Sequence, residues 1–240
     1  FRKCTSTNRK NKHRIVVTGD YKVGKDETCK NFKLIKCDTL ITEATFGLPI
    51  FQHPDPKEEI KKLISSVKKN KSNCHIIGAY ALGKAQRIMN LLRQNNYLDT
   101  IFIHGSLVKL CNYYKSQKIN LGLFEKVASK EKSFYEGKII IAPPSALKDR
   151  WSRRFPNPII CMASGWMTVK QRAKQRGIEL PLVISDHSDW NELLDTIKNS
   201  KAKNILVTHG QEDALVYYCK KNNLVSKPLS IQGRNDEEIE

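Results

Sequence analysis

The sequence has no long apolar run. None of its 240 residues lie in a stretch approaching the roughly 18 consecutive apolar residues that a membrane-crossing helix needs. The opening residues, FRKCTSTNRKNKHR, are polar and basic, so they lack the apolar core of a secretory leader. With 40% hydrophobic residues and a mean hydropathy of −0.50, we expect a globular, cytoplasmic protein without a membrane partner.

Cysteine is present, but its spacing does not match a disulfide framework. The seven cysteines are an odd number, form no CxxC pair and show no spacing typical of a disulfide scaffold. Cys74 and Cys161 stand beside strand-like runs, where we expect them to be buried as small apolar residues. The pattern indicates a reducing compartment without disulfides and argues against a zinc site built from cysteines.

Acidic residues are scarce, and the excess of basic over acidic residues is distributed unevenly along the chain. The chain holds 24 Asp and Glu against 42 Lys and Arg, a formal charge of +18. Residues 47–186 hold 24 basic and 10 acidic side chains, a net charge of +14, whereas the remaining residues carry only +4. A lysine-rich source proteome would make the whole chain basic. A basic middle between nearly balanced flanks instead favours a polyanionic partner, most often nucleic acid.

Short apolar runs alternate with helical patterns along most of the chain. Strands are predicted at 15–18, 38–42, 74–79, 101–103, 138–142, 158–162, 181–185 and 203–208. Helices are predicted at 54–69, 82–93, near 106–117, more loosely over 121–135, and at 168–176, 189–199 and 211–222. Strands separated by helices predict an α/β fold with mostly parallel sheet. The last residues, NDEEIE, are typical of a solvated tail.

Four of the apolar runs end in residues that can bind a metal or move a proton: Asp20, Glu43, His187 and His209. Any one of them alone would be an ordinary turn residue, capping acid or structural histidine. Ligands of layered α/β proteins bind at the carboxyl ends of strands, so the repeated placement predicts one convergent site. Asp, Glu and His are the residue types of hydrolytic metal chemistry.

The segment GAYALGKA, residues 78–85, nearly matches the phosphate-binding loop GxxxxGK[ST]. Two features argue against that interpretation. Ala85 replaces the hydroxyl residue that holds magnesium, and Tyr80 and Leu82 crowd a loop that should wrap phosphates. An NTPase whose nucleotide binding depends on Lys84 therefore stays a minor alternative.

Several other residues could contact nucleic acid. His104 follows a strand and precedes a helix that begins with Ser106, so it could contact phosphate. Trp166 and Trp190 could stack on bases, although core packing is the better interpretation. A short basic helix is predicted to carry Lys170, Arg172, Lys174 and Arg176. This helix is either a solvated surface or a clamp for a nucleic-acid backbone.

These motifs together resemble the metallo-β-lactamase/β-CASP nucleases, which process mRNA 3′ ends or repair DNA. TGDYK, with Asp20, resembles the family's fourth metal motif; TEATFG, SDHSDW and VTHG resemble its motifs A, B and C. GAYALGKAQR resembles a characteristic cap helix. Longer stretches, TEATFGLPIFQHP, MASGWM with Ser164, PLVISDHSDW and VTHGQEDALVYY, are most similar to the bacterial ligase-associated DNA exonucleases, sometimes labelled mRNA 3′-end processing factors. The resemblance covers nearly the whole chain.

The resemblance implies a divided α/β architecture. A partial metallo-β-lactamase αββα core would comprise residues 1–46 and 187–240. An inserted α/β β-CASP cap would comprise residues 47–186, the segment that carries the +14 charge. In such enzymes the nucleic acid runs in the cleft between core and cap.

The resemblance also implies a reaction, the zinc-dependent hydrolysis of phosphodiester bonds with two zinc ions. Asp20 would bridge the metals and His209 would bind the second one. His187 would contact the scissile phosphate and donate a proton, oriented by Glu43. We expect DNA or RNA as substrate and an ATP-dependent DNA ligase as a candidate partner. A DNA exonuclease of repair is the first interpretation; an RNA-processing ribonuclease and a non-catalytic nucleic-acid-binding module are the alternatives.

The chain departs from the family pattern at its start. The HxHxDH motif and the third-motif histidine, which supply most zinc ligands in the family, are not present upstream of TGDYK, and the first residue is Phe rather than Met. Zinc takes three or four protein ligands per ion. We therefore expect a fragment of a longer enzyme that by itself binds zinc weakly and is inactive.

Overall fold

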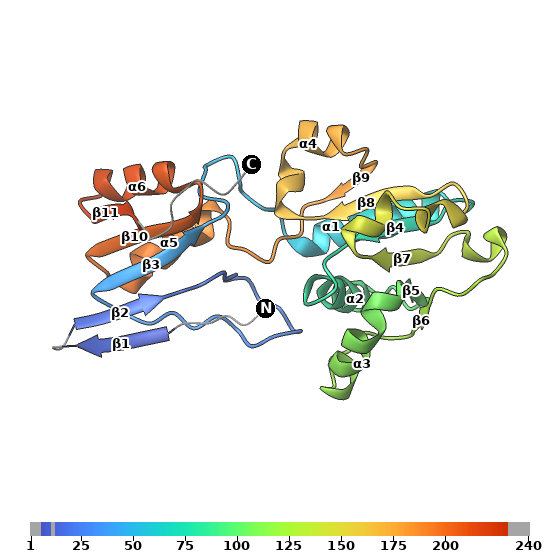
Figure 1. Cartoon of the computed structure of the whole chain (residues 1–240), viewed down its shortest axis with the longest axis horizontal. Helices are drawn as coiled ribbons and strands as arrows, with labels where there is room; N and C mark the ends of the chain where they lie inside the picture. The colour runs from blue at the N-terminus through green and yellow to red at the C-terminus, as the bar shows by residue number, and fades with distance from the viewer. Residues whose placement is uncertain (1–5, 11–12, 230–240) are drawn as a thin grey trace. The chain divides into compact units, whose positions relative to one another are not determined.

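The computed structural model describes residues 6–10 and 13–229, and their side chains from residue 13 onward. The chain divides into two compact units (Figure 1). The terminal unit takes in the described parts of residues 2–23, 32–51 and 187–240. The central unit takes in residues 24–31 and 52–186.

The terminal unit contains a five-stranded sheet in which β1 runs antiparallel to β2 and the other neighbours are parallel. Leu40, Ile205 and Val207 are fully buried in it. Its α5 packs on β3, and its α6 packs on β10 and β11. The strands in spatial order are β1 (Ser6–Lys10), β2 (His13–Val17), β3 (Thr39–Ala44), β10 (Asn204–Gly210) and β11 (Val225–Pro228); the helices are α5 (Trp190–Ser200) and α6 (Glu212–Lys221).

The central unit contains a six-stranded sheet whose strand pairs are all parallel. Its spatial order is β6 (Phe124–Lys126), β5 (Ile101–Ile103), β7 (Ile139–Ala142), β4 (His75–Gly78), β8 (Ile159–Ala163) and β9 (Leu180–Leu182). The α-helices are α1 (Pro56–Lys69), α2 (Lys84–Gln94), α3 (Val108–Ser116) and α4 (Lys170–Gln175). Short 3₁₀ segments are η1 (Gly105–Leu107), η2 (Lys132–Tyr135), η3 (Pro144–Leu147), η4 (Ser152–Arg154) and η5 (Gly165–Thr168).

Both faces of the central sheet are buried, which explains its continuous apolar strands. Ile77 and Ile141 pack with apolar residues of α1 and α2, whereas Ile76 and Ile140 pack on the opposite side with residues of the 3₁₀ segments and their connections. The two sets alternate along β4 and β7, as side chains of a strand must. One face of the sheet is therefore covered by long helices and the other by short turns.

The structure confirms the predicted α/β class and most of the predicted elements. The looser helix predicted over 121–135 is wrong, because this stretch contains the short edge strand β6 and the turn η2. The strands β1 and β11 were not predicted. The NDEEIE tail and Cys4 lie outside the described residues. Cys74 and Cys161 are buried, and six cysteines within the described ranges are free thiols.

The division into units differs from the predicted domain boundaries at two places. The change at 186/187 coincides with the prediction, but the other boundary falls between 51 and 52 instead of 46 and 47. Residues 24–31 also belong to the central unit. There the carboxylate of Asp26 lies 3.5 Å from Nε of Arg87 in α2. The names core and cap for the two units stay a prediction. No helix in the described ranges is both long and apolar enough to cross a membrane.

Candidate active site

Three of the four candidate residues come from neighbouring parallel strands of the terminal unit. Asp20 follows β2, Glu43 lies near the end of β3, and His209 lies near the end of β10. β3 is paired with β2 on one side and with β10 on the other, so the three strand ends meet at one edge of the sheet. Ligand atoms of Asp20, Glu43 and His187 lie within 4.8 Å of one another.

Glu43 is a buried carboxylate held by two partners. It is 2% exposed. Its Oε1 accepts a hydrogen bond from the backbone N–H of Tyr21 at 2.8 Å, and its Oε2 lies 2.8 Å from Nδ1 of His187. Oγ1 of Thr45 lies 3.2 Å from the same ring nitrogen. A buried charge is stable only when it is paired, and the pairing with Glu43 fixes the orientation of the imidazole.

His187 is held by the backbone that follows it. Both the N–H and the hydroxyl of Ser188 donate to the carbonyl of Tyr21, at 2.7 and 3.0 Å. Asp189 then caps α5: its side chain accepts from the N–H of Glu192, whose carboxylate in turn accepts from the N–H of Asp189. The sequence D-x-x-E is the signature of such a capping box. The position of His187 is therefore fixed by the hydrogen bonds of Ser188 and by the capped start of α5.

Asp20 and His209 form a second, more exposed pair. Oδ1 of Asp20 lies 3.9 Å from Nε2 of His209, and the side chains are 37% and 65% exposed. The ladder between β10 and β3 shifts register between Thr208 and Gly210, and His209 has the positive φ of 58°. Non-glycine residues seldom adopt this backbone conformation, which concentrates at functional sites.

Gly210 makes this bulge feasible. Its φ is 131°, and a Cβ atom added there would meet the carbonyl oxygen of Ala44 at 2.3 Å. Only glycine fits a backbone that approaches β3 so closely. The His-Gly pair therefore displays the imidazole at the edge of the sheet.

The donor set fits a metal in part. Both oxygens of Glu43 and Nδ1 of His187 already have partners, which suits a proton-handling pair better than ligation. Asp20 and His209 offer a carboxylate and an imidazole at a separation that one ion could bridge. Zinc takes three or four protein ligands, so within the described residues these two supply part of a coordination sphere.

Lys84, which was predicted to contact nucleic acid, is buried and paired within the central unit. Lys84 is 4% exposed. Its ammonium donates to the carbonyl of Ile184 at 2.8 Å and lies 3.1 Å from the carboxylate of Asp186. Arg87 also pairs with Asp186, at 3.2 Å. Burial alone would raise the pKa of Asp186, but Lys84 and Arg87 outweigh it and hold the pKa below its ordinary value. The same burial removes the basis of the NTPase alternative.

The predicted strand over 181–185 is shorter and lies in a different sheet from the strand that carries His209. β9 ends at Leu182 and pairs with β8 in the central unit. Beyond it, side chains replace the ladder: the N–H of Val183 donates to Glu59 at 2.7 Å, and the carbonyls of Ile184 and Ser185 accept from Lys84 and Arg87. His187 thus reaches the site from a connection, not from a strand end.

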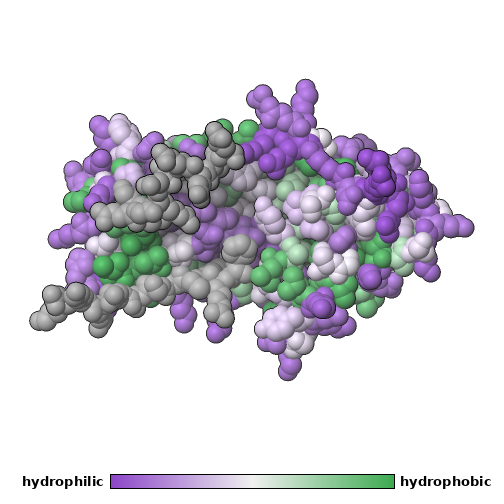
Figure 2. Space-filling view, viewed as in Figure 1, coloured by the Kyte–Doolittle hydropathy of each residue, from purple (hydrophilic) through white to green (hydrophobic). Residues whose placement is uncertain are grey.

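The basic helix is an exposed surface of the central unit. Lys170, Lys174 and Arg176 are exposed, and the guanidinium of Arg172 lies 4.3 Å from the centre of the Trp166 ring. Figure 2 shows strongly hydrophilic side chains gathered over α4. Trp166 of η5 is thus partly covered by a side chain of α4, whereas Trp190 is 8% exposed and packs edge-on against Tyr218.

The two remaining candidates act as caps. His104 accepts from the N–H of Ser106 at 3.1 Å and packs against Trp151, with ring centres 4.9 Å apart. Burial and the nearby Arg154 lower the pKa of His104. Ser164 accepts from the N–H of Trp166 at 3.3 Å at the start of η5. These contacts account for both residues without a substrate, and a role at a phosphate stays a prediction.

Sequence reasoning missed the residues that support the site. Tyr21 links Glu43 to Ser188 through its backbone, and Thr45 contacts His187 through its hydroxyl. Tyr21 and Thr45 stand inside the motifs TGDYK and TEATFG, so their positions beside Asp20 and Glu43 were the available signal. No local pattern marks the Lys22–Glu192 ion pair, at 3.0 Å, because its members are far apart in the chain.

This chain is similar to a known domain family and to a curated protein. Residues 182–223, which include His187 and His209, match the family model RMMBL, the Zn-dependent metallo-hydrolase RNA specificity domain. A probable DNA ligase of Opitutus terrae (strain DSM 11246 / JCM 15787 / PB90-1) is 22% identical over 205 residues, which cover 82% of this chain and 19% of the relative. The chain thus spans about a fifth of the length of that curated relative.

A solved structure shares the fold. The crystal structure of a protein of unknown function from Enterococcus faecalis V583 aligns with a TM-score of 0.50 and 12% identity, covering 95% of this chain and 59% of that one. The mixed α/β architecture, its parallel sheets and the matched domain give this chain a metallo-β-lactamase-like fold. The family match is confined to residues 182–223 and the ligase relative is 22% identical, so these matches show a similarity to metallo-hydrolases over part of the chain.

Proposed function

We propose that this chain belongs to a zinc-dependent nuclease that hydrolyses phosphodiester bonds. The observation that carries the proposal is the buried Glu43–His187 pair beside Asp20, at the edge of a parallel sheet. A carboxylate that orients an imidazole is a common arrangement for general acid–base catalysis. The match of residues 182–223 to a metallo-hydrolase domain with nucleic-acid specificity supports the same conclusion.

The site residues would have two roles, metal binding and proton transfer. Asp20 and His209 would hold metal through a carboxylate and an imidazole. Bound zinc would supply a Lewis acid and a more acidic water. His187 would contact the scissile phosphate and give a proton to the leaving oxygen. Glu43 would keep the ring of His187 in one orientation and stabilise its protonated form.

The substrate would be nucleic acid bound mainly by the central unit. Residues 47–186 carry a net charge of +14, and exposed basic side chains gather on α4. The name of the ligase relative supports a DNA exonuclease that works with a DNA ligase, whereas the matched domain's description favours RNA. We propose the DNA exonuclease first and the ribonuclease second; parallel digestion of matched DNA and RNA strands separates them.

The test is His187→Ala in the full-length protein that contains this chain. Turnover should fall by about 10²–10⁴-fold, the usual contribution of a general acid, while zinc content and melting temperature stay near wild type. His13→Ala is the matched control, because His13 is exposed on β2 of the same unit. Equal turnover of the two variants would remove His187 from the mechanism.

The 240-residue chain alone should bind zinc weakly and hydrolyse nothing, because Asp20 and His209 supply only part of a ligand set. Metal analysis after dialysis checks this. Two tightly held zinc ions in the isolated chain would contradict it. Intact metal binding without hydrolysis in the full-length protein would favour the non-catalytic binding module.

A further inference from the structure

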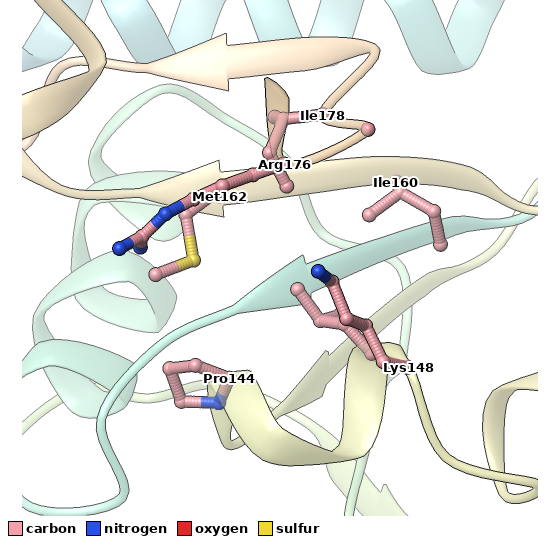
Figure 3. Close-up of a pocket in the computed structure, with 8 residues that line it drawn as sticks. Pro144, Lys148, Ile160, Met162, Arg176 and Ile178 are labelled. Carbon is pink, nitrogen blue, oxygen red and sulfur yellow. The ribbon is translucent and has the colours of Figure 1, made fainter. Parts of the chain in front are cut away.

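The central unit contains a cavity of about 340 Å³ whose lining includes none of the four residues of the candidate active site. Ile160 and Met162 of β8 form one wall, and Lys148, Arg176 and Ile178 are among the other lining residues (Figure 3). All of them belong to the central unit.

The fold leaves this cavity because short segments cover the sheet here. Ile160 and Met162 stand two residues apart on β8, so they point to the same face. That face is covered by η3, of four residues, and by the turn after the six-residue helix α4. Gly177 in this turn has a φ of 66° and open space around its Cβ position.

The cavity combines an apolar wall with two cations. Lys148 and Arg176 are exposed and carry the charges, and no acidic residue lines the cavity. In Figure 3 the guanidinium of Arg176 lies beside Met162, and the ammonium of Lys148 points away from the short helix η3, apart from Arg176. Glu179, the acid that follows Ile178, accepts a hydrogen bond from the N–H of Ile160 at 3.1 Å.

We propose that this cavity binds one nucleotide, with its base against Ile160, Met162 and Ile178 and its phosphate between Lys148 and Arg176. The proposal rests on the proposed function, which makes nucleic acid the polyanion. An inorganic anion would leave the apolar wall unused, and an uncharged apolar ligand would leave two cations without a partner. The volume lies at the lower end of ligand pockets, which suits a single nucleotide and not a longer segment.

The binding test uses metal-free chain and calorimetry with adenosine 5′-monophosphate, adenosine and inorganic phosphate as separate probes. The monophosphate should bind saturably below about 1 mM, and each partial probe at least about tenfold more weakly, because each makes half of the contacts. A tetranucleotide with and without a 5′-phosphate distinguishes a free nucleotide from the end of a strand. Only a strand source predicts that the tetranucleotide binds more tightly than the monophosphate.

Two variants probe the two halves of the cavity. Met162→Trp fills the apolar space, and Lys148→Gln with Arg176→Gln removes both surface charges. Each substitution should weaken the binding of the monophosphate by about tenfold or more, which corresponds to the loss of one or two charge-assisted contacts. Lys198→Gln is the control, since Lys198 is exposed on α5 of the terminal unit and does not line the cavity. The charge variant keeps the test decisive if the tryptophan variant does not fold.

The outcomes separate this proposal from the nuclease itself. No saturable binding of the monophosphate or the tetranucleotide, or equal weakening by Lys198→Gln, would overturn the cavity as a nucleotide site. Such a result would leave hydrolysis by the full-length protein untouched. Conversely, nucleotide binding that persists when His187→Ala has no effect on turnover would support the cavity and contradict the catalytic role.

Discussion

The two units place different residues at the carboxyl ends of their parallel strands. The terminal unit gathers Asp20, Glu43 and His209 there. In the central unit, β4, β7 and β8 end in Gly78, Ala142 and Ala163, small buried residues that carry no charge. The same sheet geometry thus brings ionisable side chains together in one unit and allows close apolar packing in the other, where the Cβ position of Gly78 is filled by Leu147 and Met162.

Charged residues inside the central unit are structural instead. Lys84, Arg87 and Asp186 form a buried cluster that also contacts Asp26. The cluster fixes the segment 184–186 to α2 and leaves surface lysines and arginines for a partner. We propose a catalytic role for the buried carboxylate of the terminal unit and a structural role for the buried cluster of the central unit, and substitutions should separate the two.

The largest contrast is expected between two buried glutamates. Glu43→Gln in the full-length protein should lower turnover by about 10³-fold, equivalent to about 4 kcal/mol in the barrier, because the amide cannot stabilise a protonated His187. Glu59→Gln, in α1 of the central unit, should leave turnover within about twofold of wild type. Initial rates on labelled DNA and RNA measure both. Similar losses in the two variants would contradict the contrast.

Lys84→Met should destabilise the central unit by about 3–5 kcal/mol, since it leaves the carboxylate of Asp186 buried without its lysine partner. Lys170→Met, at an exposed position of α4, should change the free energy of unfolding by less than about 0.5 kcal/mol. Urea unfolding followed by Trp151 and Trp166 fluorescence in a Trp190→Phe background reports on the central unit. Equal midpoints for the two variants would show that the cluster is not structural.

The central unit should also lose stability in acid through His75. This residue is fully buried, and burial lowers the pKa of His75 to about 4 from an ordinary 6.5. The unfolded chain therefore takes up the proton first, so stability is complete above pH 6.5 and falls by about 3 kcal/mol as the pH drops to 4. His75→Gln should flatten this part of the curve. Parallel curves for both proteins between pH 6.5 and 4 would contradict the assignment.

The smallest effect compares two glycines with positive φ. Gly210→Ala should cost about 2 kcal/mol or more in the terminal unit, because its Cβ would meet the carbonyl oxygen of Ala44. Gly177→Ala, with open space around it, should cost only about 1 kcal/mol in the central unit. The melting temperatures of the two variants show which substitution costs more stability. A larger loss for Gly177→Ala would mean that the bulge at His209 is not held by this close approach.

Local pattern was sufficient for much of the fold and part of the site. Apolar runs located β2, β3 and β10, and because these strands are neighbours and parallel, Asp20, Glu43 and His209 had to meet. His187 was assigned to the same group for a partly wrong reason. Its approach depends on Glu59, Lys84 and Arg87 satisfying the backbone of 183–185, contacts that no local spacing reveals.

Burial of charge was the other feature that local pattern could not provide. Lys84 follows a glycine in a phosphate-loop-like sequence, so its type and position favoured a phosphate contact. Its partner Asp186 lies in a distant part of the sequence, and only the packed unit shows that α2 is buried on nearly all sides. Lys148 carried no sequence signal, because the role we propose for it depends on a cavity formed by three separate segments.

The most direct test of the site as a whole compares metal content and turnover in four variants of the full-length protein. Asp20→Asn and His209→Gln should each lose bound zinc together with hydrolysis, as expected of metal ligands. Glu43→Gln and His187→Ala should keep wild-type zinc and still lose hydrolysis, as expected of a proton-handling pair. If all four lose zinc alike, or if all four keep wild-type turnover, the division of roles within this site is contradicted.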